Sequence, residues 1–501
     1  MGEVEHNCGV GLCHSLHDAY DLGNALQHRG REAGGIVAQA YDGRIDAVRW
    51  VGRFNEDVFD LEGLHHIFAN LHGGSDSHYH SFGVHTRYAT KGTKDINEML
   101  KEAHPITIGG KTRRYGRYEV IENADAAIVH NGQVNPGFLK DIDLKDLQTS
   151  SDTEVLLYFI QEKGVKELLR EVPGAYTFAV FDKRLRDVIV TRDRTGIKPG
   201  HIGVKDYKMC MASESSALEE IGARPIENIR PGSIYYFSPD GSRKSERIVK
   251  PEWSGCFFEL FYIAHPDSVI DNFHVRTIRQ SLGKEMAREF VPEGKAIVTF
   301  VPRCPEVAAE AYAQTNNDLE FMHVFNKSVS ERAFMGTNAK ERKASIKRNL
   351  HLLPNTKRLL HDQEIVLFDD SIVRGNNIKT SLELLAQAGV RRTNVLIYTP
   401  PIGIYDRNKN PCGCEWGVDM PPSDEFMARG EDGKNKSPRM IAAEIGEGLD
   451  MEVVVKYLTK KGMGRVFKKH GIRESFLCER CIGGHKPFKP EIIVPITRGM
   501  S

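Results

Sequence analysis

The sequence has no excess of charge of either sign, because 68 basic side chains balance 68 acidic ones. A neutral chain has no general attraction for nucleic acid or anionic membranes, so neither is expected as a partner. Apolar runs of the roughly 20 residues that span a bilayer are also missing. The first seven residues, MGEVEHN, are too short and too polar for a secretory signal. We therefore expect a cytoplasmic protein.

Cysteine is scarce, with an odd count of nine in 501 residues. A disulfide framework is not expected from such a set, so thiols that serve as a nucleophile or as metal ligands are the better interpretation. The length exceeds what a single hydrophobic core normally supports, which predicts two or three domains.

The two halves of the chain differ in pattern. Residues 8–245 alternate short apolar strands with glycine-rich turns, interrupted by helical stretches near 21–30 and 150–172, which predicts packed sheets that carry outer helices. From about residue 282, strand and helix patterns alternate, as in a parallel α/β sheet. We expect residues 246–281 to link a domain at 8–245 to one at 282–455, followed by a helical and cysteine-rich segment at 456–501. The tail that starts with MIAAEIGEGLDMEVVVKYLTKKG, residues 440–462, is expected to be mostly helical.

Cys8 opens the sequence CGVGL and is the candidate nucleophile. Alone, a Cys-Gly pair also describes a buried structural cysteine, because free cysteine is among the most buried residue types. Cys13 is a poorer candidate because no glycine follows it. Four further motifs follow CGVGL in the order QHRGREAGGI, HTRYAT, VHNG and SSDTE.

This order of motifs resembles the amino-terminal-nucleophile glutamine amidotransferases. The resemblance implies a four-layer αββα sandwich, a propeptide at residues 1–7, and Cys8 as the first residue of the mature chain. A terminal α-amine has a pKa near neutrality, so it can act as the base that activates the thiol. Attack on the glutamine amide would give a glutamyl thioester and release ammonia.

The resemblance also implies roles for four other residues. Arg87 would bind the glutamine carboxylate and Asp152 the ammonium group, while Asn131 and the amide of Gly132 would form the oxyanion hole. Taken singly, Arg87 could equally be a surface ion pair, Asp152 a helix cap and Asn131-Gly132 a hairpin turn.

The stretch EIVLFDDSIVRGNN, residues 364–377, describes a buried strand that ends in two acids and a loop that leads into a helix. Adjacent buried acids are costly unless they meet a ligand or metal, and free amides at a helix N-terminus bind phosphate. The stretch resembles the phosphoribosyl pyrophosphate loop of type I phosphoribosyltransferases, and DDSIVRG is similar to that of the amidophosphoribosyltransferases. The resemblance implies that Asp369 and Asp370 bind the ribose hydroxyls and contribute to Mg²⁺ binding. The 5′-phosphate would lie in the loop formed by Ser371, Arg374, Gly375, Asn376 and Asn377.

The second half departs from this family in three places. Asn376 and Asn377 stand where threonines are usual, TFVPRCPEVA matches the pyrophosphate region in part, and SVSERAFMG matches the flexible loop only around Arg332, a further expected substrate ligand. An asparagine amide can still donate to phosphate and cap a helix, so we expect a working loop. A paralogue with weakened transferase activity is the alternative.

Four cysteines fall where cluster-bearing members of this family place their ligands: Cys256, Cys414, Cys478 and Cys481. Four thiolates suit a [4Fe–4S] cluster, and zinc is the alternative because it also takes four cysteines. Cysteines that bind no metal are the remaining alternative. Cys412 lies two residues from Cys414 and leaves the third ligand ambiguous.

Together these features predict an amidophosphoribosyltransferase, which makes 5-phosphoribosylamine, glutamate and pyrophosphate at the first committed step of purine synthesis. The family resemblance implies a homotetramer or dimer that purine nucleotides inhibit. A glucosamine-phosphate synthase would need sugar-isomerase domains, and an asparagine synthetase would need an ATP pyrophosphatase loop. A regulatory nucleotide sensor would carry a DNA-binding domain. We find none of these features in the sequence.

Overall fold

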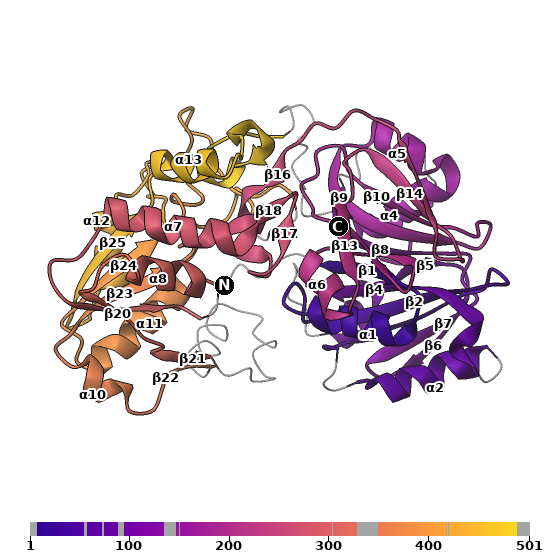
Figure 1. Ribbon diagram of the computed structural model, residues 1–501, viewed down its shortest axis with the longest axis horizontal. Coiled ribbons are helices and arrows are strands. Elements are labelled where there is room, and N and C mark those ends of the chain that lie inside the picture. The colour runs from indigo at the N-terminus through magenta and orange to yellow at the C-terminus, as the bar shows by residue number, and fades with distance from the viewer. Residues whose placement is uncertain are drawn as a thin grey trace. The chain divides into compact units, whose positions relative to one another are not determined.

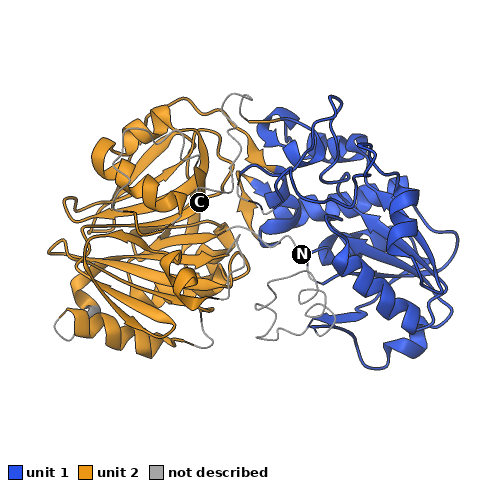
Figure 2. Cartoon of the chain, turned by 180° about the vertical axis from the view of Figure 1, so that it is seen from behind, with its two compact units in different colours: residues 1–4, 257–267, 273–485 blue, residues 5–256, 268–272, 486–501 orange. Residues whose placement is uncertain are grey.

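The computed structural model divides the chain into two compact units (Figure 2). The amino-terminal unit comprises residues 5–256, 268–272 and 486–501, and the carboxy-terminal unit comprises residues 1–4, 257–267 and 273–485. The structure describes residues 8–54, 58–72, 75–88, 95–134, 147–149, 151–302, 304–327, 349–416, 418 and 420–487. The predicted propeptide at 1–7 and Arg332 lie outside these residues.

The amino-terminal unit contains two antiparallel sheets (Figure 1). The first has nine strands in the order β13 (Arg224–Asn228), β11 (His201–Lys205), β12 (Lys208–Ala212), β1 (Gly9–Cys13), β4 (Tyr79–Arg87), β2 (Ala33–Ala40), β3 (Ile45–Val51), β7 (Tyr118–Glu122) and β6 (Lys111–Tyr115). The second has six strands in the order β15 (Arg243–Arg247), β14 (Ser233–Phe237), β10 (Val188–Arg192), β9 (Gly174–Asp182), β8 (Ala126–Val134) and β5 (Ile106–Ile108).

Three hydrophobic cores stack these sheets into four layers. Apolar side chains of both sheets, among them Val10 of β1 and Val129 of β8, form the middle core. Helices α1 (Leu16–Ala25), α2 (Leu61–Leu71) and α6 (Ser215–Glu220) cover the nine-stranded sheet. On the opposite side, helices α4 (Asp152–Lys163) and α5 (Val165–Glu171) cover the six-stranded sheet (Figure 1). Strands with both faces buried need this arrangement, and the predicted αββα sandwich is confirmed.

The helical stretch expected at 150–172 is two helices rather than one. Gly164, at a φ of +85°, ends α4 and begins α5, because the left-handed backbone region suits glycine and stops a helix. At the other end of α4, the Ser151 hydroxyl caps the helix by accepting from the Thr153 amide at 3.2 Å. A further short helix in this unit, α3 (Ile96–Lys101), packs on β3.

The carboxy-terminal unit contains a five-stranded parallel sheet in the order β20 (Leu319–Phe321), β19 (Ala296–Phe300), β23 (Glu364–Asp369), β24 (Arg392–Ile397) and β25 (Glu452–Tyr457). All six residues of the central strand β23 are buried. This is the pattern of a strand that is covered on both faces, so the predicted parallel α/β sheet is confirmed. The helices of this unit are α7 (Val275–Glu289), α8 (Glu306–Ala313), α10 (Thr356–Leu360), α11 (Asn376–Gln387), α12 (Pro438–Ile445) and α13 (Lys460–Lys469).

The sequence-based expectation was wrong in two details of this unit. The stretch EVVVKY, assigned to a mostly helical tail, is the edge strand β25, whose three valines favour extended backbone and whose partner is β24. Helix α7 begins at Val275, inside the segment expected to be a linker. A short π-helix, η3 (Glu259–Ile263), also lies in that segment.

The remaining elements are short. They are η1 (Asp76–His78), β16 (Gly255–Cys256), β17 (Val269–Ile270), β18 (Phe273–His274), the antiparallel pair β21 (Phe325–Lys327) and β22 (Leu350–Leu352), η5 (Glu474–Phe476), β26 (Leu477–Cys478) and η6 (Arg480–Ile482). Among the described residues, every helix is too short or too polar to cross a bilayer.

Candidate active site

Cys8 immediately precedes β1, an interior strand of the nine-stranded sheet. The Gly9 amide donates to the Thr86 hydroxyl at 3.2 Å, and a Cβ at Gly9 would lie only 2.6 Å from that oxygen and 2.8 Å from Leu26 Cβ. Because any side chain at position 9 would clash with these groups, only glycine fits after the candidate nucleophile. This contact gives the Cys-Gly motif a steric reason.

The Cys8 thiol lies in a mixed electrostatic environment. Burial raises its pKa above the ordinary value for cysteine. A hydrogen bond from the Tyr88 backbone amide acts against this rise, as do three nearby cations, Arg87, Lys198 and Arg29. The site therefore favours a neutral thiol at rest but supplies positive charge for a thiolate once a base has removed the proton.

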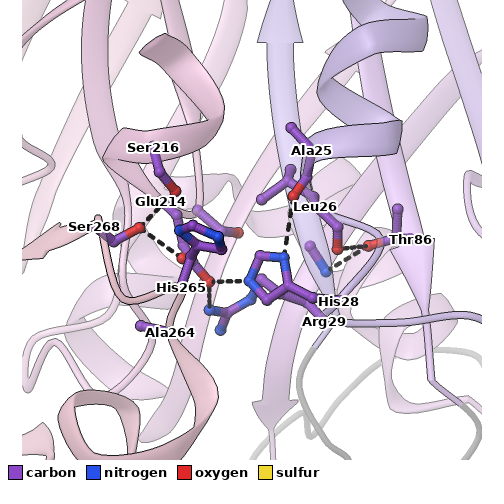
Figure 3. A network of polar contacts seen from close by, with 12 residues as sticks. Ala25, Leu26, His28, Arg29, Thr86, Glu214, Ser216, Ala264, His265 and Ser268 are labelled. Carbon is purple, nitrogen blue, oxygen red and sulfur yellow. Dashed lines mark hydrogen bonds and ion pairs between the residues drawn. The ribbon is translucent and has the colours of Figure 1, made fainter. Parts of the chain in front are cut away.

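A buried ion-pair network holds the chain beside Cys8 (Figure 3). The Arg29 Nε group donates to the Cys8 carbonyl at 3.3 Å, and its Nη1 group pairs with Glu214. The same carboxylate accepts hydrogen bonds from His28 Nε2 at 2.8 Å and from the Ser268 hydroxyl at 2.7 Å. Figure 3 shows His28 and Arg29 on one side of Glu214 and Ser268 on the other. Arg29 and Glu214 are both fully buried, and removal of either would leave the other as an unpaired buried charge. The pair therefore fixes the start of β1.

Arg87 and Asp152, the two residues predicted to bind glutamine, lie in this unit, and both interact with the charge of Glu102. Arg87 ends β4 and its Nη2 group pairs with Glu102, while its buried Nη1 group has no hydrogen-bond partner among the described residues. Asp152 begins α4 and accepts from the Val134 amide at 2.8 Å. Burial raises the pKa of Asp152 to about 6, although the Val134 and Thr153 amides lower it, and the Glu102 charge adds to the rise.

Asn131 and Gly132 lie in β8, paired with Thr177 and Tyr176 of β9. The Asn131 side chain is buried, and neither its oxygen nor its nitrogen has a partner among the described residues. A Cβ at Gly132 would lie 2.1 Å from the Ala175 carbonyl oxygen, so this position excludes every side chain. A buried amide without a partner is costly, and such groups are retained where a ligand supplies the missing bond.

Asp369 and Asp370 lie at the carboxyl end of β23, where parallel α/β sheets bind ligands. Both are buried, at 7 % and 4 % exposed. Burial raises the pKa of Asp370 to about 6, whereas hydrogen bonds from Ser371 and Asp369 and the charge of Arg279 lower it. The Ser371 hydroxyl donates to Asp370 Oδ2 at 2.5 Å, and the Thr399 hydroxyl donates to the Asp370 carbonyl at 2.8 Å.

The loop after these acids leads directly into α11. Gly375, at a φ of +77°, precedes the helix and has Met427 Cε 2.7 Å from its would-be Cβ, so a glycine is required there. The guanidinium of Arg374 pairs with Asp424. Asn376 and Asn377 form the first turn of α11, whose amides point out of the helix N-terminus.

Known proteins with similar sequences match the chain over most of its length. A glutamine amidotransferase domain model matches residues 120–245. The amidophosphoribosyltransferase of Bacillus subtilis is 29 % identical over 480 residues, which cover 93 % of this chain and 90 % of that protein. The amidophosphoribosyltransferase of Methanothermobacter thermautotrophicus is 26 % identical over 506 residues, which cover 97 % of this chain and 95 % of that protein.

Two solved structures are similar to the chain. Glutamine phosphoribosylpyrophosphate amidotransferase from B. subtilis, complexed with ADP and GMP, superposes with a TM-score of 0.74 at 26 % identity, covering 96 % of this chain and 97 % of that one. A structure described as the allosteric regulatory enzyme of purine biosynthesis has a TM-score of 0.75 at 26 % identity, with 97 % and 98 % covered. The chain is similar to the amidophosphoribosyltransferases over nearly its whole length. The resemblance inferred from the sequence motifs is thereby confirmed.

Sequence reasoning did not find all the charged residues of the glutaminase region. Arg29 lies within the quoted motif QHRGREAGGI but was given no role, and its partner Glu214 is 185 residues away. Glu102, the partner of Arg87, belongs to no motif. Full burial of both members of an ion pair is the signal that identifies Arg29 and Glu214, and it exists only in the folded chain.

The cysteines expected to bind a cluster are divided between the two units, with Cys256 in the amino-terminal unit and the other three in the carboxy-terminal unit. Cys414 Sγ accepts from the Trp416 and Val418 amides, each at 3.4 Å. Cys412 Sγ instead accepts a hydrogen bond from Arg480 Nη1 at 3.0 Å. Within the described part of the chain, no three histidine, cysteine or acidic side chains are arranged around one metal position.

Proposed function

We propose that the chain hydrolyses glutamine at Cys8 and transfers the ammonia to phosphoribosyl pyrophosphate, giving 5-phosphoribosylamine, glutamate and pyrophosphate. The observation that carries the glutaminase half is the Arg87–Glu102–Asp152 group. Arg87 offers an unused Nη1 donor for a carboxylate, and Asp152 offers a buried acceptor for an ammonium. A free α-amino acid carries these two charges, so the pair fits glutamine.

The glutaminase reaction uses groups of the amino-terminal unit. Removal of residues 1–7 would leave the Cys8 α-amine as the base for its own thiol. Thiolate attack on the amide carbon places negative charge on the carbonyl oxygen, and the Asn131 side chain with the Gly132 amide would receive that charge. Collapse of the tetrahedral species releases ammonia and leaves a Cys8 thioester, which water hydrolyses to glutamate.

The transferase reaction uses the β23–α11 loop. Asp369 and Asp370 would hold the ribose hydroxyls, and residues 371–377 would hold the 5′-phosphate through backbone amides, since the Arg374 guanidinium is engaged by Asp424. Two adjacent buried carboxylates are oxygen donors of the kind Mg²⁺ prefers, and the ion would neutralise the departing pyrophosphate. Ammonia displaces pyrophosphate at the anomeric carbon, and the protein contributes by positioning the substrate and excluding water.

A [4Fe–4S] cluster bound by Cys256, Cys414, Cys478 and Cys481 is part of the proposal, with zinc as the alternative. The chemistry of Cys414 supports it, because two backbone amides that donate to one sulfur stabilise a thiolate ligand. Bound there, the group would be structural or oxygen-sensing, since neither half-reaction transfers electrons.

We also propose regulation by analogy with a relative, and an assembly state from the family resemblance of the sequence motifs. A similar enzyme was solved with ADP and GMP, so we propose that purine nucleotides inhibit this chain as well. A homotetramer or dimer and a cytoplasmic location belong to the same proposal.

The test is an assay of anaerobically purified full-length protein with glutamine, Mg²⁺ and phosphoribosyl pyrophosphate, in which glutamate and pyrophosphate are measured together. Equal release of both supports the coupled reaction. We expect Cys8→Ala to abolish glutamine-dependent synthesis while free ammonia still supports pyrophosphate release. Glutamate release without pyrophosphate would refute the transferase half, and loss of the ammonia reaction in folded Cys8→Ala would refute the two-site division.

A further inference from the structure

Three histidines and a threonine form a buried cluster in the amino-terminal unit. His85 lies in β4, His104 precedes β5, His130 lies in β8 and Thr153 lies in the first turn of α4. Their exposed fractions are 0 %, 5 %, 2 % and 2 %. None of the four has a role in the proposed chemistry, and they are called the histidine–threonine cluster below.

Hydrogen bonds and ring stacking join the four residues. His85 Nε2 lies 3.0 Å from the His130 carbonyl oxygen, and because a carbonyl only accepts, His85 must carry its proton on Nε2. The His85 and His104 rings stack with centroids 4.0 Å apart at 18°. Thr153 Oγ1 lies 2.8 Å from His130 Nδ1 and 3.3 Å from His104 Nε2. The hydroxyl has one proton, so it donates to one of these imidazoles and accepts from the other.

Each member lies within two residues of a group proposed to contact glutamine or its partner. His85 is two residues before Arg87, and His130 directly precedes Asn131. Thr153 directly follows Asp152, and His104 is two residues after Glu102, the partner of Arg87. These groups come from two sheets and a helix, since β4 belongs to the nine-stranded sheet and β8 to the six-stranded one. The bond from His85 to His130 therefore ties the two sheets together beside the site.

Stability alone does not account for the cluster. The ring nitrogens His85 Nδ1, His104 Nδ1 and His130 Nε2 have no hydrogen-bond partner among the described residues. Each such buried group loses its hydrogen bonds to water without replacing them, a cost that an apolar side chain of similar size would avoid. The three rings do not surround a metal position either, within the described part of the chain. Polar residues retained at this cost point to a requirement of the reaction.

We propose that the histidine–threonine cluster is a positioning device for the glutaminase reaction, and that the Thr153 hydroxyl joins the oxyanion strand β8 to the helix that carries Asp152. The inference rests on the proposed glutaminase activity. His130 Nε2 lies 2.8 Å from where a Cβ of Gly132 would be, so the His130 ring rests against the oxyanion residue itself. Its other nitrogen is held by Thr153, and the arrangement sets the spacing between Gly132 and Asp152.

The test compares three full-length variants with the unaltered protein. Thr153→Val keeps the shape of the side chain but removes the hydroxyl, and Thr153→Ser keeps the hydroxyl. Thr191→Val is the matched control, because it also removes a buried threonine hydroxyl, bonded to the Ser233 carbonyl at 2.8 Å in the same six-stranded sheet. For each protein, kcat and KM for glutamate release, ammonia-dependent pyrophosphate release and the thermal midpoint are measured.

We expect Thr153→Val to lower kcat/KM for glutamine by about 10²-fold, the scale for reacting groups misplaced by about 1 Å. Thr153→Ser restores the activity, Thr191→Val retains it, and all three keep the ammonia reaction. If Thr153→Val does not fold, His104→Phe is measured instead. It removes the hydrogen bond between His104 and the Thr153 hydroxyl but keeps an aromatic ring stacked on His85.

If the unaltered protein is active and Thr153→Val has the same kcat/KM as Thr191→Val, this inference is wrong but the proposed glutaminase stands. Loss of activity in Thr153→Ser would have the same meaning. A parent protein that releases no glutamate overturns the proposed glutaminase and this inference with it.

Discussion

Recognition of glutamine by Asp152 should depend on pH near 6. The carboxylate must be ionised to hold the substrate ammonium, and burial raises its pKa to about 6, with the charge of Glu102 adding to the rise. Below that pH, a proton occupies the oxygen that the ammonium needs. An ordinary aspartate would stay ionised down to pH values of about 4. If Asp152 binds glutamine as proposed, the folded site should therefore raise the acid limit of glutamine binding.

The expected change is about tenfold. With a pKa of about 6, the ionised fraction of Asp152 is roughly nine tenths at pH 7 and roughly one tenth at pH 5. The second-order rate of any reaction that requires the ionised form falls in the same proportion. Asp152→Asn keeps the shape but has no charge to titrate, so its recognition of glutamine should be weaker at all pH values and should lack this dependence.

The assay is alkylation of Cys8 by a glutamine analogue that carries a diazoketone in place of the amide. Because the reactivity of the thiol also changes with pH, the rate is divided by the rate at which iodoacetamide alkylates Cys8. Iodoacetamide lacks the amino-acid charges, so its rate at Cys8 reports on the reactivity of that thiol without glutamine recognition. The ratio should fall about tenfold from pH 7 to pH 5 in the unaltered protein and remain flat in Asp152→Asn. A flat ratio in the unaltered protein would refute the assignment of Asp152.

Three other outcomes test the site. Gly132→Ala, whose Cβ would meet the neighbouring strand at 2.1 Å, should lower glutamate release by about 10²–10³-fold, whereas Gly116→Ala, with nothing within 4 Å, should leave it unchanged; equal activities would exclude the oxyanion role. Asp370→Asn should reduce ammonia-dependent pyrophosphate release by about 10–100-fold through loss of a charge-assisted hydrogen bond, and unchanged saturation with phosphoribosyl pyrophosphate would contradict this. Cys414→Ser should lose the bound iron measured by elemental analysis and visible absorbance, and Cys412→Ser should retain it; the reverse result would make Cys412 the ligand.

The fold class was predictable because the local pattern of strands and helices in each half of the chain indicates it. The central strand β23 is a continuous apolar run that ends in two acids, and a glycine-containing loop leads from it into a helix, which is the pattern of a parallel α/β unit. Strand β25 was missed because three consecutive valines beside helical patterns do not show a period, and its assignment depends on pairing with β24.

The candidate site was predictable only where a role depends on residue type and order. Cys8, Asn131, Asp152 and Asp370 belong to short motifs, because a nucleophile, an oxyanion donor and a charge partner each require a particular side chain. Their roles stay predictions, as do those of the four candidate cluster cysteines.

The sequence alone determined which side chains are available for chemistry and the order in which they occur. The tertiary structure decided how they are supported. Glu214 faces Arg29 across 185 residues, and His85 meets the His130 carbonyl across two sheets. Contacts of this kind depend on how sheets pack, and side-chain packing between distant segments leaves no periodic signal in the chain. The pKa of Asp152 belongs to the same class, because burial is a property of the fold and not of the residue.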